Sequence, residues 1–249
     1  MDIEKIIAQV TEKVMSQLAG GDACEGAVPM DQVAGRLEHS LLNPDMTMEQ
    51  IVNGCMEAKK YRFANVCVTP YLVPAAANCL QNSGIKVCAP VAFPHGAAST
   101  EAKLAEIKAM AAAGADELDI SLNLVAVKSG RLDDARRDLD AMVKAAYGRV
   151  QLKAIYEQGL YTPEEKEKVL IMIKNSGVEF LKISNFLSGK KAAPEDAKYV
   201  RSIVGRGVGI KIDGGVKTLE TAMSLFAAGA DRIGLTAGVA IAQEAMKRK

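Results

Sequence analysis

The chain has 249 residues, 49% of them hydrophobic, a length that suits one large domain such as an α/β barrel of roughly 250 residues. Its 31 basic and 30 acidic residues give a net charge of +1, which argues against a nucleic-acid partner or an anionic membrane surface. The five cysteines form no Cys-x-x-Cys pair and there are only two histidines, so we expect reduced thiols in a cytoplasmic protein and no metal site. No apolar run approaches the roughly 18 residues of a membrane span.

Residues 1–18 have the pattern of an amphipathic helix, with apolar residues at helical spacing: Ile3, Ile6, Ile7, Val10, Val14 and Leu18. Residues 19–35 read as a flexible linker because glycines and a proline stand there among small and polar residues. A helix on such a linker either packs on its own domain or binds a partner, and the sequence leaves both open. Short N-terminal helices of this kind resemble the encapsulation peptides of bacterial microcompartment enzymes, which implies a shell protein as the partner of residues 1–18.

From residue 36 to residue 249, short apolar runs alternate with helical patterns. We predict strands at about 36–42, 64–68, 86–92, 116–122, 151–156, 179–184, 208–213 and 231–235. We predict helices near 47–60, 71–82, 99–113, 131–146, 163–175, 194–204, 217–228 and 237–247. Eight strand–helix units predict a TIM (β/α)8 barrel. A doubly wound open sheet is the alternative, but its Gly-rich dinucleotide fingerprint is missing after the first strand.

Three lysines stand in the middle of predicted strands at a regular interval. Lys153, Lys182 and Lys211 are each 29 residues apart. A lysine buried in a strand must be paired, or its pKa must fall. Neighbouring parallel strands lie about 4.8 Å apart. Lys182 and Lys211 should therefore disfavour each other's charge, which makes one of them a candidate neutral nucleophile.

The fourth predicted strand adds a carboxylate to these lysines. Active sites of barrels lie at the C-terminal ends of the strands and on the loops that follow. Asp119 on the fourth strand and Lys153 on the fifth therefore join the candidate site. The alternative for these two residues is an interior ion pair without a part in catalysis.

Eight short strings, in order from about Arg36 to Ile241, resemble the deoxyribose-phosphate aldolase family, whose members are class I aldolases with a TIM-barrel fold. The strings are H-S-L-L-N-P (39–44), V-C-V-T-P (66–70), F-P-H-G (93–96), G-A-D-E-L-D (114–119), L-K-A-I-Y-E (152–157), F-L-K-I-S (180–184), G-I-K-I-D-G-G (209–215) and A-G-A-D-R-I-G (228–234).

The resemblance implies a role for each buried polar residue. Lys182 would form the Schiff base, Lys211 would lower the pKa of Lys182, Asp119 would transfer protons through a water, and Lys153 would orient Asp119. The iminium formed by a neutral amine acts as an electron sink for the adjacent carbon–carbon bond. The implied reaction is the reversible cleavage of 2-deoxy-D-ribose 5-phosphate to acetaldehyde and glyceraldehyde 3-phosphate, without a cofactor. Barrel enzymes of this type are often dimers, so we expect a homodimer.

The loops expected to hold the substrate phosphate depart from the family pattern. After the Schiff-base lysine the family has T-S-T-G, whereas this chain has Ile183, Ser184, Asn185 and Phe186. The remaining phosphate-binding candidates are Ser184, Gly214, Gly215 and Thr236, with the glycine N–H groups and the N-terminus of a helix beginning near Thr236 as donors. Alternatively, the two glycines only form a tight turn after the seventh strand.

Asp213 is the most informative departure and is also a candidate substrate-binding residue. It lies two residues after Lys211 on the same strand and so points the same way. We expect its carboxylate to pair with Lys211 and to add negative charge where a phosphate would approach. Asp213 and Phe186 together favour, as an alternative, an aldolase with a different or non-phosphorylated acceptor. A weakly catalytic microcompartment cargo protein is a second alternative.

Overall fold

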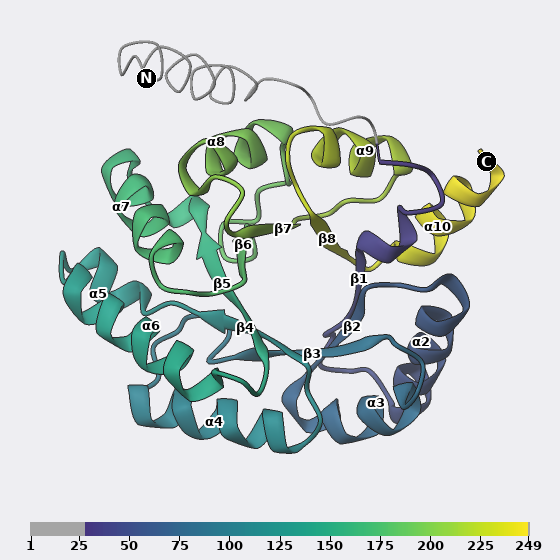
Figure 1. Ribbon diagram of the computed structural model, residues 1–249, viewed down its shortest axis with the longest axis horizontal. Helices are drawn as coiled ribbons and strands as arrows, with labels where there is room; N and C mark the ends of the chain where they lie inside the picture. Colours follow the sequence, from purple (N-terminus) through teal and green to yellow (C-terminus); the bar gives the residue numbers. More distant parts are fainter. Residues whose placement is uncertain (1–27, 249) are drawn as a thin grey trace, which may run out of the picture.

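The computed structural model describes residues 28–248, which form a closed barrel of eight parallel strands (Figure 1). The strands are β1 (Leu37–Leu41), β2 (Asn65–Val68), β3 (Lys86–Val91), β4 (Glu117–Ser121), β5 (Gln151–Glu157), β6 (Phe180–Ser184), β7 (Gly209–Asp213) and β8 (Arg232–Leu235). Each strand pairs with the next, and β8 pairs with β1 to close the barrel. The predicted TIM barrel is confirmed, and the open sheet is excluded.

The helices surround the barrel (Figure 1). They are α2 (Met48–Tyr61), α3 (Val73–Leu80), α4 (Thr100–Ala112), α5 (Leu124–Lys128), α6 (Leu132–Ala146), α7 (Pro163–Lys174), α8 (Pro194–Val204), α9 (Leu219–Ala227) and α10 (Gly238–Lys247), with short 3-10 turns η2 (Ala34–Arg36), η3 (Pro70–Leu72) and η4 (Gln158–Leu160). None of the helices within residues 28–248 has the length and hydropathy that crossing a membrane would need.

The structure contains one short helix, α5, that the sequence did not predict. Asn123 caps this five-residue helix by accepting a hydrogen bond from the Ala126 N–H at 3.0 Å.

The predicted helix at residues 1–18 lies outside the described residues. Of the predicted linker, residues 28–35 are described, and Val28 and Val33 are buried there. This end of the linker therefore packs against the barrel.

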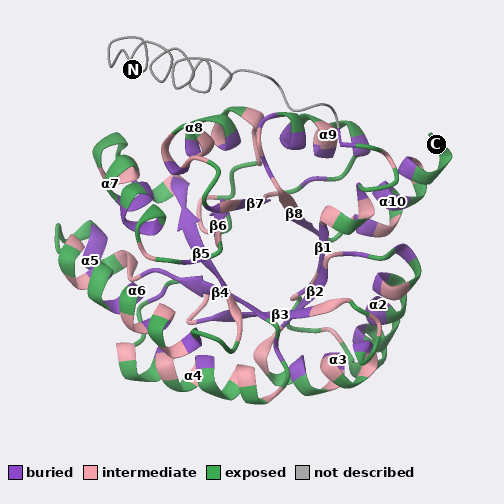
Figure 2. Ribbon diagram, viewed as in Figure 1, coloured by how far each residue is buried: buried purple, intermediate pink, exposed green. Residues whose placement is uncertain are grey.

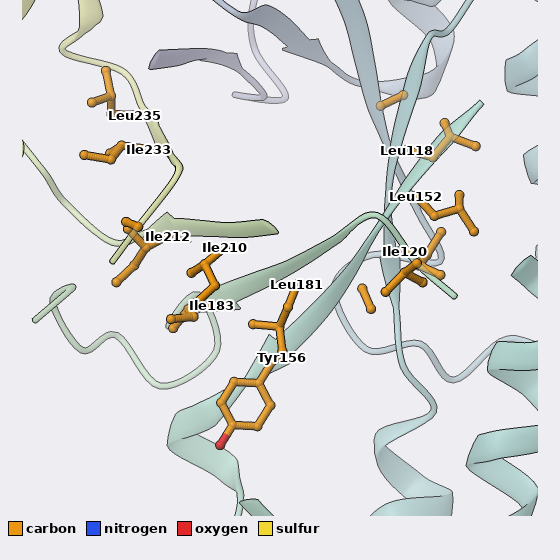
Figure 3. Close-up of a cluster of buried hydrophobic side chains, with 14 of the residues drawn as sticks. Leu118, Ile120, Leu152, Tyr156, Leu181, Ile183, Ile210, Ile212, Ile233 and Leu235 are labelled. Carbon is orange, nitrogen blue, oxygen red and sulfur yellow. The ribbon is translucent and has the colours of Figure 1, made fainter. Parts of the chain in front are cut away.

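The main hydrophobic core lies between the barrel and the helices. Alternate strand residues point outward to the helices, and Figure 3 shows a cluster of them: Leu118, Ile120, Leu152, Tyr156, Leu181, Ile183, Ile210, Ile212, Ile233 and Leu235. All are buried, and Figure 2 shows the strands buried while the helices carry exposed residues. Burying one such aliphatic side chain contributes about 1.5–3 kcal/mol. This outer layer fixes the strands and leaves their inner faces free for polar residues.

Candidate active site

The inner face of the barrel is lined by charged side chains, although barrel interiors are dominated by branched apolar residues. Contacts across the barrel show that these side chains point inward, because Arg232 on β8 lies 2.9 Å from Glu117 on β4. Six buried charged groups of this interior form one cluster: Glu38, Glu117, Asp119, Lys153, Lys182 and Lys211. A buried charge is costly unless it is paired, so the pairing of these groups determines what the site can do.

Asp119 lies at the centre of three lysines. Its Oδ2 atom is 2.9 Å from Lys182 Nζ and 2.8 Å from Lys211 Nζ, and its Oδ1 atom is 3.3 Å from Lys153 Nζ. Burial raises the pKa of Asp119, but the three ammonium groups outweigh this and hold it well below its usual range. The pair of Asp119 and Lys153 that the sequence suggested is present, as part of this larger cluster.

Two further carboxylates, Glu38 and Glu117, lie below the lysines, toward the N-terminal ends of the strands. Glu38 Oε2 is 2.6 Å from Lys211 Nζ, and Glu117 Oε2 is 2.6 Å from Lys153 Nζ. Arg232 bridges the two carboxylates at 3.2 Å and 2.9 Å. The sequence reasoning did not assign these residues to the site. The available signal was the alternation of acidic and apolar residues along the first and fourth strands.

Asp213 contacts Lys211, as expected from the sequence, but it pairs more closely with Lys182. Its Oδ2 atom lies 2.8 Å from Lys182 Nζ, whereas its Oδ1 atom lies 3.9 Å from Lys211 Nζ. Lys211 is held below by Glu38 and Asp119, so Asp213 is left to pair with the lysine of the neighbouring strand. Gly234 on β8 makes room for this carboxylate, because a Cβ atom there would lie 2.0 Å from Asp213 Oδ1.

Lys182 is the lysine that reaches the mouth of the barrel. Its side chain is 5% exposed, whereas those of Lys153 and Lys211 are fully buried. Burial lowers the pKa of Lys182, and so does the Lys211 ammonium. The Asp119 and Asp213 carboxylates raise this pKa, and the net shift is upward. The expected repulsion from Lys211 is therefore present, but two carboxylates outweigh it. In this structure Lys182 is an ammonium held between Asp119 and Asp213.

The predicted phosphate-binding residues differ from one another in their surroundings. The Ser184 hydroxyl donates a hydrogen bond to Glu157 Oε2 at 2.6 Å, so this hydroxyl already has a partner inside the barrel mouth. Gly214 and Gly215 have φ values of +143° and +66°; a Cβ atom at Gly214 would lie 2.8 Å from Ala192 N, whereas one at Gly215 would meet nothing within 4 Å, so only Gly215 borders open space. Thr236 is exposed after β8, and α10 begins at Gly238, slightly later than expected.

Two aromatic side chains form a wall beside the mouth. The rings of Phe93 and Phe186 lie 4.9 Å apart, and Lys182 Nζ is 5.8 Å from the Phe93 ring centroid. Phe186 is 65% exposed, so it extends this wall to the surface. Lys182 therefore lies near two carboxylates and an aromatic ring.

The site also contains a group of potential metal ligands. One ligand atom each from Cys67, Cys88 and Asp119 lies within 4.8 Å of the others. Burial raises the pKa of the Cys88 thiol well above its usual value, and this thiol donates to Asp119 Oδ1 at 3.3 Å. A neutral thiol and a carboxylate already surrounded by three ammonium groups do not suit a cation.

Comparisons with known proteins agree with this geometry. Residues 26–244 match the model of the DeoC/LacD family aldolases. A deoxyribose-phosphate aldolase from Desulfitobacterium hafniense is 41% identical over 210 residues, covering 84% of this chain and 96% of that protein. One from Staphylococcus carnosus is 41% identical over 207 residues, covering 83% and 94%.

Solved structures show the same likeness. An aldolase called QR15 superposes with a TM-score of 0.82 at 30% identity, covering 87% of this chain and 96% of that one. A deoxyribose phosphate aldolase from Aeropyrum pernix, described as tetrameric, superposes with a TM-score of 0.80 at 27% identity, covering 88% and 93%.

Proposed function

The chain belongs to the DeoC/LacD family of aldolases, and from this membership we propose that it is a class I aldolase that uses Lys182 as its Schiff-base nucleophile. The proposed reaction is the reversible cleavage of 2-deoxy-D-ribose 5-phosphate to acetaldehyde and glyceraldehyde 3-phosphate. The observation that supports it best is the cluster in which Asp119 contacts Lys182, Lys211 and Lys153 at the mouth and centre of the barrel.

The arrangement suggests what each residue does. Lys182 must lose a proton before its amine can add to the C1 carbonyl, and Asp119 and Asp213, at 2.9 Å and 2.8 Å, are the acceptors within reach. Loss of water from the carbinolamine gives an iminium, which accepts the electron pair of the C2–C3 bond as that bond breaks. We propose that Lys211 and Lys153 keep Asp119 oriented and charged. Positioned proton transfers of this kind contribute about 10²–10⁴-fold each.

The test of the Schiff base is covalent trapping. The protein is incubated with acetaldehyde and borohydride, and its intact mass and peptides are measured. We expect an ethyl adduct on Lys182 in the wild type and none in Lys182→Met, which keeps the length of the side chain without the amine. An adduct on another lysine, or undiminished cleavage by Lys182→Met, would show that the nucleophile is misassigned.

A second candidate function keeps this chemistry but changes the acceptor. Asp213 adds negative charge beside Lys182, Ser184 is engaged with Glu157, and Phe186 stands where the family has a glycine. These three features favour a non-phosphorylated or otherwise different aldehyde. The test is the ratio of kcat/KM for 2-deoxy-D-ribose 5-phosphate and 2-deoxy-D-ribose. A strong preference for the phosphorylated sugar would reject this candidate.

We also propose that residues 1–18 form an independent targeting segment, joined through residues 19–35 to a catalytic domain of residues 36–249. Its partner would be a microcompartment shell protein in the cytoplasm, and a weakly catalytic cargo protein is the corresponding alternative. Fusing residues 1–20 to a fluorescent protein and co-expressing shell proteins tests the targeting, and diffuse fluorescence would contradict it. A catalytic domain without residues 1–27 should fold and retain its activity.

The oligomeric state is part of the same proposal. We propose a homodimer, as expected for barrel enzymes of this type, although the similar protein from Aeropyrum pernix is described as tetrameric. Light scattering coupled to size-exclusion chromatography distinguishes the two assemblies by mass.

A further inference from the structure

Asp213 and Glu38 each have a buried carboxylate oxygen that accepts no hydrogen bond among the described residues, but that of Glu38 lies 2.6 Å from Lys211 Nζ. The Oδ2 atom of Asp213 pairs with Lys182 Nζ at 2.8 Å, but its Oδ1 atom is buried and has no hydrogen-bond partner among the described residues. A buried acceptor without a donor is costly, so a group supplied by the substrate would be favoured there. Hydroxyl groups are the donors that a sugar offers.

The fold makes space for this carboxylate. Asp213 and Gly234 are partners in the pairing of β7 with β8. Any side chain at position 234 would collide with it, because a Cβ atom would lie 2.0 Å from Oδ1 and 2.9 Å from Lys211 Cε. The side chain of Asp213 is 25% exposed and that of Lys182 is 5% exposed, so the carboxylate is the more accessible of the two to a substrate.

Asp119 is less suited to taking a proton from the substrate. It is fully buried, and both of its oxygens are engaged by three ammonium groups and the Cys88 thiol. The lysines hold its pKa well below the usual range despite its burial, which makes it a weak base. Asp213 has one close ammonium partner, and its Oδ1 atom accepts no hydrogen bond and lies 3.9 Å from Lys211 Nζ, so it is the more available acceptor.

We propose that Asp213 is a catalytic residue that accepts the proton of the substrate's β-hydroxyl group as the carbon–carbon bond breaks. This proposal rests on the proposed Schiff-base function of Lys182. Once the substrate is bound, Lys182 Nζ becomes the iminium nitrogen, and only three carbon atoms separate it from the β-hydroxyl oxygen. A carboxylate in contact with that nitrogen is therefore within reach of the hydroxyl as well, and a general base must lie about 2.6–3.2 Å from its target.

The step balances without another reactant. The hydroxyl proton moves to Asp213, and the C3–O bond becomes the carbonyl of the departing aldehyde. The electron pair of the C2–C3 bond forms the C1=C2 bond of an enamine, and the nitrogen loses its positive charge. Asp213 can then return its proton to C2, which regenerates an iminium that water hydrolyses to acetaldehyde. The carboxylate thus finishes in its starting state.

The test separates formation of the Schiff base from bond cleavage. Acetaldehyde has no β-hydroxyl group, so borohydride trapping of acetaldehyde on Lys182 reports the first step alone. Single-turnover cleavage of 2-deoxy-D-ribose 5-phosphate reports both steps. In Asp213→Asn, which keeps the shape and a hydrogen bond but removes the base, we expect cleavage to fall about 10²–10⁴-fold. Trapping should be equal to or faster than in the wild type, because Asp119 remains 2.9 Å from Lys182 as a proton acceptor and the Asp213 charge, which raises the pKa of Lys182, is gone.

A second variant and a control complete the design. Gly234→Ala displaces the Asp213 carboxylate and also crowds Lys211 Cε at 2.9 Å, and the same division between trapping and cleavage is expected. Glu220→Gln, on the exposed first turn of α9, should leave both steps unchanged. Cleavage by Asp213→Asn within about 10-fold of the wild type, or an equal loss of trapping and cleavage, would overturn the assignment. A wild type that forms no adduct on Lys182 would instead reject the proposed function itself.

Discussion

Glu117 should be among the most costly side chains to neutralise, although it lies below the nucleophile and would not contact a substrate there. Its carboxylate contacts Lys153 Nζ at 2.6 Å, Arg232 Nη1 at 2.9 Å and Lys86 Nζ at 2.9 Å. Glu117→Gln keeps the volume but leaves these cations without their shared negative charge. Removing one partner of a buried ion pair costs about 3–5 kcal/mol. For a domain of this size, that corresponds to a fall in Tm of about 6–20 °C.

The assay is urea unfolding followed by circular dichroism, at neutral pH and in acid. Burial raises the pKa of Glu117, but Lys153 and Arg232 outweigh this and lower it. Its contribution to stability is therefore present above its unfolded pKa of about 4.3 and is lost as the pH falls toward the folded value. The difference in the free energy of unfolding between wild type and Glu117→Gln should be roughly constant from about pH 6 to 8. It should become smaller below about pH 4.3.

The matched control is Glu244→Gln, which breaks the exposed pair of Glu244 with Arg248 and should cost at most about 0.5 kcal/mol. A loss of less than about 1 kcal/mol in Glu117→Gln, or a difference that does not change in acid, would refute the reasoning. The interior charges would then contribute to catalysis without being needed for stability.

Three further outcomes are expected. Dialysis against EDTA should leave cleavage of 2-deoxy-D-ribose 5-phosphate unchanged, because the proposed chemistry uses an amine; activity that a divalent ion restores would contradict this. Gly96→Ala should cost more than about 3 kcal/mol in urea unfolding, because Gly96 has φ +62° and a Cβ atom would lie 1.8 Å from Leu122 O. Leu118→Ala should cost about 2–5 kcal/mol by the same measurement, since this fully buried side chain fills the layer between barrel and helices.

The barrel was predictable because its outward-facing residues carry a strong local signal. Every predicted strand overlaps an observed one, and no predicted bound differs from the observed bound by more than one residue. The regular interval of Lys153, Lys182 and Lys211 also placed these residues on adjacent strands, as observed. The short helix α5 was missed because a five-residue element has too little periodicity to detect and depends on its Asn123 cap.

The pairing of charges was less predictable because it depends on groups that lie across the barrel. Alternation along β7 placed Asp213 on the same face as Lys211, but it said nothing of Glu38 on β1, which lies 2.6 Å from Lys211. The expected contact of Asp213 with Lys211 is therefore long, at 3.9 Å, and the contact with Lys182, at 2.8 Å, is the close one. Residues two apart on a strand share a face, but a long lysine side chain can contact carboxylates from any strand that lines the barrel interior.

The connected ion pairs of the interior contain five cations and four carboxylates, namely Lys86, Lys153, Lys182, Lys211 and Arg232 with Glu38, Glu117, Asp119 and Asp213. Removal of one proton therefore makes this network electrically neutral. Lys153 and Lys211 are poor donors of that proton, since each lies 2.6 Å from a glutamate of its own at full burial. Lys182 is held from its exposed side by Asp213. A substrate bound to the Asp213 carboxylate, as proposed, would weaken one of the two contacts that keep Lys182 charged, and would thereby couple substrate binding to activation of the proposed nucleophile.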